Sequence, residues 1–175
     1  MGFEILPMVE YDGVWSIDDM TLTRIWDAME ATGIDKVVFF GGTVIGAYGW
    51  LQLCKSPLNM IHFVIDDNKT PVFCAWLNNF GRNHAVAHFF SFPSIWGKHT
   101  EKIGRLSLNY WFNMPTKLEV LIGEIPSVNT KAIEFAKRMG FTEAGEIPNI
   151  QHGDSPDTKC GRTIVHYVRG KEWDL

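Results

Sequence analysis

The clearest alternation of apolar and polar positions along the chain is a strand, helix, strand unit in its last third. Residues 118–122 form a short apolar run of strand length, which predicts a strand. Apolar side chains then recur with helical spacing from Asn129 onward, which predicts an amphipathic helix. Gly140 can end this helix in the left-handed conformation, and Phe141 can fold back on its last turn as in a Schellman cap. A second strand is predicted at 142–147.

The middle of the chain contains three apolar runs separated by short polar turns. Such runs predict consecutive strands of an antiparallel meander. The third run is apolar at almost every position, which indicates burial on both faces of a sheet. A helix follows the meander, and an alternating stretch near the C-terminus predicts a final strand. In chain order, these predicted elements are strands at 59–66, 71–77 and 84–92, a helix at 100–113 and a strand at 162–168.

The N-terminal third predicts helices more strongly than strands. Ser16 is a suitable N-cap, the acids after it favour the positive end of a helix dipole, and Gly33 ends the apolar stripe. The other predictions in this part, and the one long loop, follow from apolar runs punctuated by prolines and glycines. They are a strand at 3–9, a strand or buried turn at 36–40, a helix at 43–55 and a loop at 148–161.

Length and composition narrow the class of protein. A chain of 175 residues without a linker predicts a single domain over 1–175. A formal net charge of −4 argues against non-specific nucleic-acid binding, which needs a basic face. No apolar run reaches the length of a membrane span, and the N-terminus lacks the pattern of a signal peptide.

The counts of cysteines and aromatic residues add two expectations. The 3 cysteines are few and odd in number, which favours reduced thiols in a cytoplasmic protein over a disulfide framework. With 12 Phe and 7 Trp, some aromatic side chains can face a groove or a partner, and the content allows a homodimer.

The strand, helix, strand unit resembles the late motif of the acetyl-CoA-dependent N-acetyltransferases of the GNAT superfamily. The matching residues are Asn129-x-x-Ala132, the apolar Phe135, and the pair Gly140-Phe141. The order of predicted elements also resembles that family: a meander, a helix, a strand, a helix and two strands. The resemblance implies an α/β fold with a mixed, mostly antiparallel central sheet flanked by helices, and acetyl-CoA as co-substrate.

The same resemblance places the coenzyme between two strands. In the family, two neighbouring parallel strands splay apart and the pantetheine arm enters the gap, which here lies between 84–92 and 118–122. Asn129 is then expected to help hold the coenzyme. The backbone of Phe90, Ser91 and Phe92 is expected to polarise the thioester carbonyl.

The phosphate-binding turn of the family lies after the first of these strands, and here it departs from the pattern. Backbone N–H groups at a helix N-terminus hold the pyrophosphate, and glycines let it approach closely. In this chain Trp96 stands at the position of an expected Arg or Gln, and His99 and Glu101 stand at the two glycine positions. Two readings stay open. Either Trp96, Gly97, Lys98, His99 and Thr100 form a divergent cradle for coenzyme A, or the stretch is an ordinary capping loop with Thr100 as the cap.

Acetyl transfer to an amine requires a base for the amine, a polarised carbonyl and a proton for the leaving thiolate. The family often supplies that proton from a Tyr, whose position is Ala136 here, and Tyr110 is the substitute that the sequence offers. His88 and Glu119 are the candidate bases, with Glu124 as a third. These residues also have structural interpretations: His88 as a core histidine, Glu119 as a solvent-facing strand residue and Tyr110 as part of the core packing.

A metal site is the weaker interpretation of the histidines. His84 and His88 share one face of a predicted strand, and His62, His166 or Cys160 could complete a ligand set. No tight ligand spacing supports such a site, so no metal is expected.

The resemblance implies an N-acetyltransferase that moves an acetyl group from acetyl-CoA to an unidentified amine, either a small molecule or a peptide. The alternative is a catalytically silent GNAT-fold binding or assembly protein, for example in phage morphogenesis. Ala136 and the altered glycine turn motivate this alternative. The stretches at 50–59 and 97–100 are similar to those of compact phage and prophage proteins with this fold.

Overall fold

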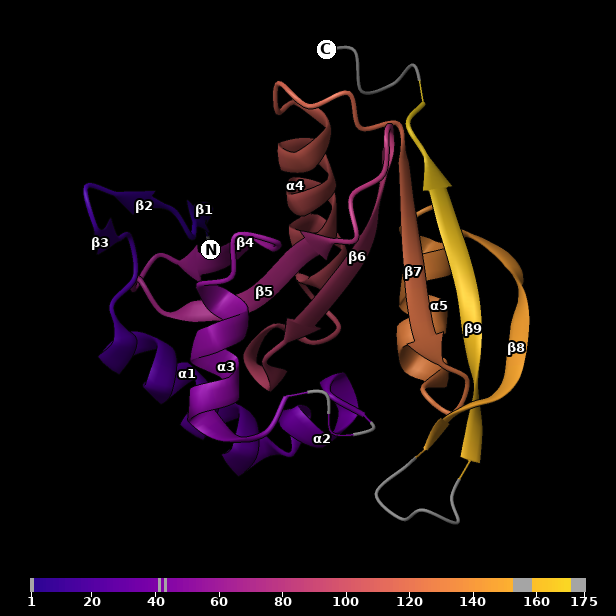
Figure 1. Cartoon of the computed structure of the whole chain (residues 1–175), viewed down its shortest axis with the longest axis horizontal. Coiled ribbons are helices and arrows are strands. Elements are labelled where there is room, and N and C mark those ends of the chain that lie inside the picture. Colours follow the sequence, from indigo (N-terminus) through magenta and orange to yellow (C-terminus); the bar gives the residue numbers. More distant parts are fainter. Residues whose placement is uncertain (1, 41, 43, 153–158, 171–175) are drawn as a thin grey trace.

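The computed structural model describes residues 2–40, 42, 44–152 and 159–170, and for 149–152, 159 and 160 it describes the backbone alone. The described residues form a seven-stranded sheet in the order β1-β4-β5-β6-β7-β9-β8 (Figure 1). In that order the strands span Phe3–Pro7, Met60–Asp66, Pro71–Asn78, His84–Ser91, Val120–Pro126, Lys159–Val168 and Thr142–His152. A separate hairpin pairs β2 (Glu10–Tyr11) with β3 (Val14–Trp15).

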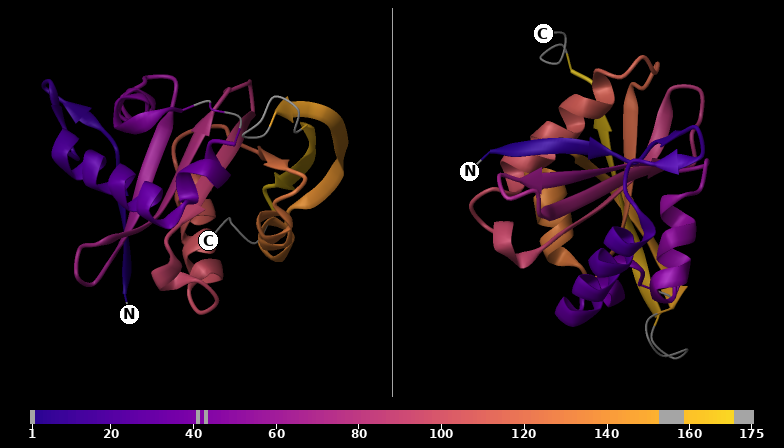
Figure 2. Two further views of the ribbon diagram at one scale, coloured as in Figure 1. Left: turned by 90° about the horizontal axis from the view of Figure 1, so that it is seen from below. Right: turned by 90° about the vertical axis from the view of Figure 1, so that its left-hand side faces the viewer.

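The described helices lie on both faces of this sheet. Figure 2 shows α4 and α5 on one face and α1, α2 and α3 on the other. We call these the α4/α5 face and the α1–α3 face. The helices span Asp19–Thr32 (α1), Ile34–Val38 (α2), Gly46–Cys54 (α3), Thr100–Phe112 (α4) and Thr130–Arg138 (α5), and a 3-10 turn, η1, spans Pro93–Ile95.

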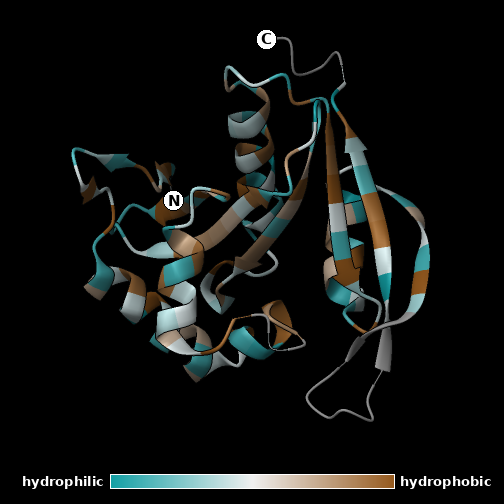
Figure 3. Ribbon diagram, in the orientation of Figure 1, coloured by the Kyte–Doolittle hydropathy of each residue, from teal (hydrophilic) through white to brown (hydrophobic). Residues whose placement is uncertain are grey.

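Two apolar cores result, one on each face of the sheet. Side chains of successive strand residues point to opposite faces. Phe73, Ala75 and Leu77 of β5 therefore pack toward α4 and α5, whereas Cys74 and Trp76 pack toward α1–α3. Both faces of the central strands are covered, so these strands are hydrophobic along most of their length in Figure 3. The edge-proximal strand β9 instead alternates hydrophobic and hydrophilic residues in the same view.

One junction in the sheet differs from all the others that the structure describes. Every neighbouring pair of strands is antiparallel except β6 and β7, which are parallel. Their pairing starts at His84 with Val120 and ends at Val86 with Ile122. Beyond this point the two strands diverge, as Figure 1 shows.

The predicted meander, the helix after it and the strand, helix, strand unit are confirmed, with shifted boundaries. The strand predicted at 118–122 is β7, which starts later and continues through Gly123 to Pro126. A glycine normally weakens a strand. Here a Cβ on Gly123 would lie 2.7 Å from Val165 Cγ2, so the glycine is required by the close approach of β9, with which β7 pairs along its whole length.

Two predictions in the N-terminal third of the chain are wrong. Residues predicted as a strand or buried turn at 36–40 lie mostly in the short helix α2, because the left-handed Gly33 (φ 69°) ends α1 and starts the next helical turn. The N-cap of α1 is Asp18, whose Oδ1 accepts from Thr21 N at 2.7 Å. Ser16 instead donates its hydroxyl to Pro7 O at 2.7 Å and so holds the β2–β3 hairpin.

Both ends of the loop predicted at 148–161 are strand instead. The strand β8 continues to His152 and β9 begins at Lys159, and the rest of the predicted loop lies outside the described residues. The predicted Schellman cap, in contrast, is confirmed. Phe141 N donates to Ala136 O and Gly140 N to Lys137 O, both at 3.0 Å, with Gly140 at φ 94°.

We expect Gly140→Ala to destabilise the protein more than Gly33→Ala. Both glycines end a helix at positive φ, where a Cβ costs about 1–2 kcal/mol. A Cβ at Gly140 would also lie 3.1 Å from Tyr167 Cε2, whereas a Cβ at Gly33 would meet no atom within 4 Å in the part of the chain that the structure describes. Urea unfolding of the two variants measures the difference. Equal losses would show that Tyr167 does not constrain the end of α5.

Candidate functional site

A pocket of about 620 Å³ opens where β6 and β7 diverge, and we call it the splay pocket. Its walls come from the C-terminal halves of both strands, the turn before α4, the outer side of α5, and the end of α1 with α2. The lining residues used below are Trp76, Ala87, His88, Phe89, Phe90, Ser91, Trp96, Gly97, Thr100, Glu124, Ile125, Asn129, Lys131, Phe135 and Arg138. The pocket therefore connects the two faces of the sheet through the gap between the strands.

The alternation of side chains gives the two ends of this pocket different chemistry. On β6, Ala87 and Phe89 pack toward the α4/α5 face, so the intervening His88 points to the α1–α3 face. On β7, Ile125 contacts Ala136 of α5, so Glu124 likewise points to the α1–α3 face. One end is thus formed by a helix N-terminus and α5, and the other carries an imidazole and a carboxylate.

His88 is held in place by two contacts. Its Nε2 lies 3.0 Å from Asn78 Oδ1, and its ring stacks on Trp76 with centroids 5.0 Å apart and an interplanar angle of 12°. Burial lowers the pKa of His88 to about 4, the Glu124 carboxylate opposes that shift, and the Arg162 guanidinium adds to it. The ring is therefore neutral at pH 7.

Glu124 forms an ion pair with Arg162, a residue of the neighbouring strand β9. The two side chains are 33% and 28% exposed, so each remains accessible from the pocket or from solvent. Sequence reasoning placed Glu124 third among the candidate bases and did not consider Arg162. No local signal marks this pair, because it depends on the register between β7 and β9.

The turn before α4 is open to a ligand. Gly97 has φ 81°, and a Cβ there would meet no atom of the described residues within 4 Å. Trp96 is anchored by its Nε1, which donates to Ser91 O at 3.2 Å and lies 3.0 Å from Ser91 Oγ. The predicted capping role of Thr100 is wrong. The N-cap residue is His99, none of the described side chains caps the helix, and the Thr100 hydroxyl donates to Ile95 O at 3.1 Å.

The two residues that break the family pattern do not fill this turn. The His99 ring lies against Phe3, with centroids 5.4 Å apart. Glu101 Oε1 accepts from Arg138 Nε at 2.9 Å, so its charge is compensated. Neither side chain lines the splay pocket, nor does the exposed Lys98. Thr100, the first residue of α4, lines the pocket, and no side chain of the described residues caps the first turn of this helix.

The cations and the amide at this end of the pocket come from α5 and the residue before it. Asn129 lines the pocket while its Oδ1 accepts from Ala132 N at 3.2 Å, so this side chain caps α5. Lys131 and Arg138 also line this wall, where Arg138 is paired with Glu101 and Glu134 adds a carboxylate. Sequence reasoning missed both cations, although they follow Asn129 at positions typical of one helix face. An uncapped helix start beside two cations suits a phosphate or pyrophosphate group.

Three predicted site residues lie elsewhere. Glu119 Oε2 accepts from Asn83 Nδ2 at 2.7 Å at the paired end of β6 and β7. Given the rise per residue of a β-strand, Glu119 lies roughly 16 Å from Glu124. Tyr110 packs its ring on His62, with centroids 5.0 Å apart, and burial raises its pKa. Phe92 packs edge-on against Phe90 rather than lining the pocket, whereas Phe90 and Ser91 both line it.

The histidines considered as metal ligands do not converge. His62 is fully buried and its Nε2 lies 2.9 Å from Ser107 Oγ, on the α4/α5 face. His88 points to the other face. In the part of the chain that the structure describes, no group of three or more His, Cys, Asp or Glu side chains could hold a metal ion. The side chain of Cys160 lies outside that part.

Comparisons with known proteins identify the fold. No protein-family model and no curated protein sequence matches the chain. Its structure is similar to spermidine N-acetyltransferase from Vibrio cholerae in complex with CoA and spermine. The TM-score is 0.76 at 13% identity, covering 99% of this chain and 98% of that chain. The chain has the GNAT fold.

Further solved structures agree with this assignment. Ribosomal-protein-S5-alanine acetyltransferase from Vibrio fischeri matches at a TM-score of 0.71 and 12% identity, covering 97% of this chain and 94% of that chain. A dodecameric structure of the V. cholerae spermidine N-acetyltransferase matches at 0.71 and 12%, covering 97% and 95%. The α/β GNAT fold with its mixed, mostly antiparallel sheet, expected from the sequence motif, is confirmed. None of the helices in the described part of the chain has the length and apolar character that crossing a bilayer requires.

We expect acid to destabilise the protein through His62. Burial lowers the pKa of His62 to about 3 in the folded protein. Below pH 6.5 the imidazole is protonated in the unfolded chain but stays neutral in the fold, so the free energy of unfolding decreases as the pH falls from 6.5 toward 3. At pH 5 the loss is about 2 kcal/mol relative to pH 7.5. Urea unfolding at the two pH values should show this loss in the parent chain and a smaller one in His62→Gln. Ser107→Ala is the control, since it removes the hydrogen bond but keeps the buried imidazole. Identical pH dependence in the parent chain and His62→Gln would contradict the assignment.

Proposed function

We propose that the chain transfers an acetyl group from acetyl-CoA to an amine. The observation that carries this proposal is the splay pocket, in which an uncapped helix start and two cations lie at one end and Glu124 and His88 at the other. The GNAT fold of the structures that it resembles supports the proposal. Two of these structures are of a spermidine N-acetyltransferase, and one of the two is a complex with CoA and spermine.

The coenzyme would bind along the gap between the strands. The first turn of α4, with Gly97 and Thr100, would hold the pyrophosphate together with Lys131 and Arg138. Trp96 and Asn129 flank the same wall. Beyond Val86, the edge of β6 that faces β7 has no strand partner in the described pairs. Its backbone groups near Phe90 and Ser91 can therefore bond the pantetheine arm and polarise the thioester carbonyl.

The transfer itself requires one base and a polarised carbonyl. The amine nitrogen forms a bond to the carbonyl carbon, the carbon–sulfur bond breaks, and the amine proton goes to a base. We assign this base to Glu124, because its carboxylate lies in the pocket and also attracts a cationic amine. The neutral His88 ring is a weak base at its lowered pKa, so we assign it to the wall of the acceptor site beside Trp76.

The leaving thiolate has no protein donor at the position where the family carries Tyr. Ala136 stands there and is 4% exposed. An ordinary thiol has a pKa of about 8.5, so the thiolate can leave near neutral pH and take its proton from solvent. The acceptor amine, whether a small molecule or a peptide, would enter from the α2 side, where Ile34, Val37 and Val38 form an apolar wall.

Ala136 also favours the alternative function, a GNAT-fold protein that binds a partner without catalysis. Such a protein, in a phage particle assembly for example, would need neither a general acid nor a phosphate turn that matches the family pattern. The two proposals differ in coenzyme binding and turnover.

We expect acetyl-CoA to bind with micromolar affinity and Gly97→Asp to weaken that binding at least tenfold. The added carboxylate repels the phosphates and occupies space at the first turn of α4. Calorimetry with acetyl-CoA measures binding, with desulfo-CoA and ATP to test coenzyme specificity. Gly13→Asp is the matched control, because Gly13 has nearly the same positive φ and lies in the distant β2–β3 turn.

Two outcomes of this experiment would count against the site. If Gly97→Asp bound the coenzyme as well as the parent chain did, the cradle at the start of α4 would be wrong. If the parent chain did not bind acetyl-CoA even at millimolar concentration, the proposed acetyltransferase function would be wrong and the binding-protein alternative would be favoured.

We expect Glu124→Gln to lower kcat by about 100-fold or more, since it removes the base and keeps the shape of the side chain. Coenzyme affinity should change less than threefold. Glu119→Gln is the control, because this carboxylate lies just before the other end of the same strand and should leave kcat within twofold. His88→Gln should reduce kcat less than Glu124→Gln does. A panel of polyamines and N-terminal peptides serves as the acceptor set. Unchanged turnover in Glu124→Gln would remove it as the base.

A further inference from the structure

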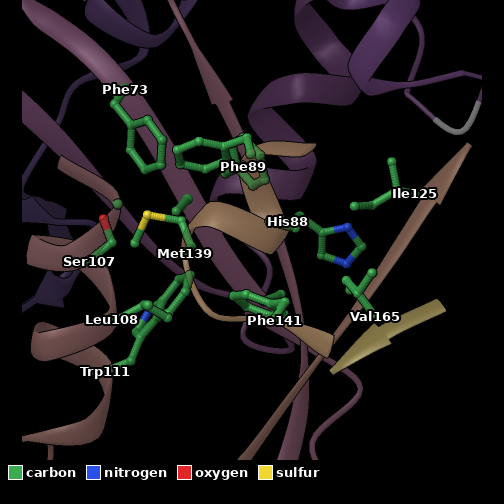
Figure 4. Close-up of a pocket in the computed structure, with 16 residues that line it drawn as sticks. Phe73, His88, Phe89, Ser107, Leu108, Trp111, Ile125, Met139, Phe141 and Val165 are labelled. Atoms are coloured by element: carbon green, nitrogen blue, oxygen red, sulfur yellow. The ribbon is translucent and has the colours of Figure 1, made fainter. Parts of the chain in front are cut away.

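A second, inner cavity of about 60 Å³ lies beneath the splay pocket, on the α4/α5 face (Figure 4). It is lined by β5 and β6, by α4 and α5, by Met139 and Phe141 between α5 and β8, and by β7 and β9. The inner cavity and the splay pocket share Ala87, His88, Phe89, Ile125 and Phe135. These shared residues lie at the gap between the strands, where the thioester of a bound coenzyme would sit. The inner cavity is therefore an extension of the proposed reaction site.

Small residues keep this cavity open. They come from β5, β6 and β7 and from the helices α4 and α5, and they are Ala75, Ala87, Gly104, Gly123 and Ala136. The two helices approach closely here, since a Cβ on Gly104 would lie 2.9 Å from both Met139 Sδ and Phe135 Cζ. A larger side chain at any of these positions would occupy the space or displace its neighbours.

The lining of the inner cavity is apolar. Most of its wall consists of aromatic and aliphatic side chains, and no Asp, Glu, Lys or Arg lines it. The labelled members in Figure 4 include Phe73, Leu108, Met139, Phe141 and Val165. A ligand group that fills this space must therefore be a hydrocarbon rather than a charged or strongly polar group.

Water is a poor occupant of the same space. A buried water needs two to four polar partners. Ser107 Oγ, one polar group of the lining, already lies 2.9 Å from His62 Nε2. Trp111 Nε1 is buried and has no hydrogen-bond partner among the described residues, so it could offer one donor. His88 Nε2 is engaged by Asn78. The cavity thus lacks the set of partners that would hold an ordered water.

We propose that the inner cavity receives the tail of an acyl group longer than acetyl, so that the donor is a short-chain acyl-CoA of about four carbons. A volume of 60 Å³ has room for about two groups the size of a water or a methylene. Two methylene groups beyond acetyl make a butyryl group. The reaction balances as for acetyl: the acyl carbon exchanges its bond to sulfur for one to the amine nitrogen, and the amine proton goes to the base. This inference rests on the proposed function.

The test compares acyl-CoA donors of two, four and eight carbons with one amine acceptor. We expect kcat/KM of the parent chain to be about tenfold higher for butyryl-CoA than for acetyl-CoA, from burial of two methylenes, and to fall for octanoyl-CoA. Two variants fill the cavity from opposite sides: Ala136→Leu on α5 and Ala75→Val on β5. Each should lower the butyryl-to-acetyl ratio at least tenfold. Ala28→Leu is the matched control, since it makes the same change on α1, away from both cavities, and should keep the ratio of the parent chain.

The outcomes separate this inference from the proposed function. If the parent chain uses acetyl-CoA but turns over butyryl-CoA tenfold less well, the inference is wrong and the acetyltransferase stands, even if the filling variants fail to fold. If the variants fold and the ratio does not change, the acyl tail lies elsewhere and the inference is equally wrong. If calorimetry detects no binding of CoA itself, the proposed function is wrong, and the inference that rests on it is wrong as well.

Discussion

The site depends on how briefly β6 and β7 pair. β7 pairs with β9 from Val120 to Pro126, but with β6 only as far as Ile122. The backbone of β7 is thus paired with β9 along its whole length, whereas its second half is not paired with β6. Parallel pairing is slightly less stable per residue than antiparallel pairing, so this is the junction at which separation costs least. The unpaired edges left behind need partners, and a bound chain with amide groups can supply them.

The divergence also decides where charge can be placed. Glu124 and Glu101 both lie beside the opening, and each is paired with an arginine from a different element: Arg162 of β9 and Arg138 of α5. A partly buried carboxylate without a partner would be costly. Pairing Glu101 removes the repulsion that its position in the sequence suggests, and pairing Glu124 leaves a carboxylate in the pocket that a cationic amine can approach. In the proposed reaction, the same gap would hold an anionic donor at one end and a cationic acceptor at the other.

The sequence revealed those features that depend on neighbours along the chain. The meander at 59–92 and the Schellman cap at Gly140 follow from local patterns, and the fold was predicted from the resemblance of Asn129, Gly140 and the order of elements to the GNAT family. The site was predicted less well because its decisive contacts join distant segments. The turn of His99 toward Phe3 and the pairing of Glu124 with Arg162 depend on packing and register that no local spacing encodes. The sequence ranked Glu119 above Glu124 because the point of divergence was unknown.

Ala136 connects two properties that look unrelated in the sequence. It stands where the resembled family has a tyrosine, so a potential proton donor is missing, and this absence favoured a silent protein. In the structure the same residue is 4% exposed and lines the inner cavity with Gly104 and Ala75. A tyrosine side chain would fill a space of about 60 Å³. The loss of the hydroxyl and the gain of an apolar space thus follow from the same residue. Natural cores rarely leave such a void unfilled, because the side chains that line it lose their packing partners. A ligand that restores those contacts gives the cavity a physical reason to persist.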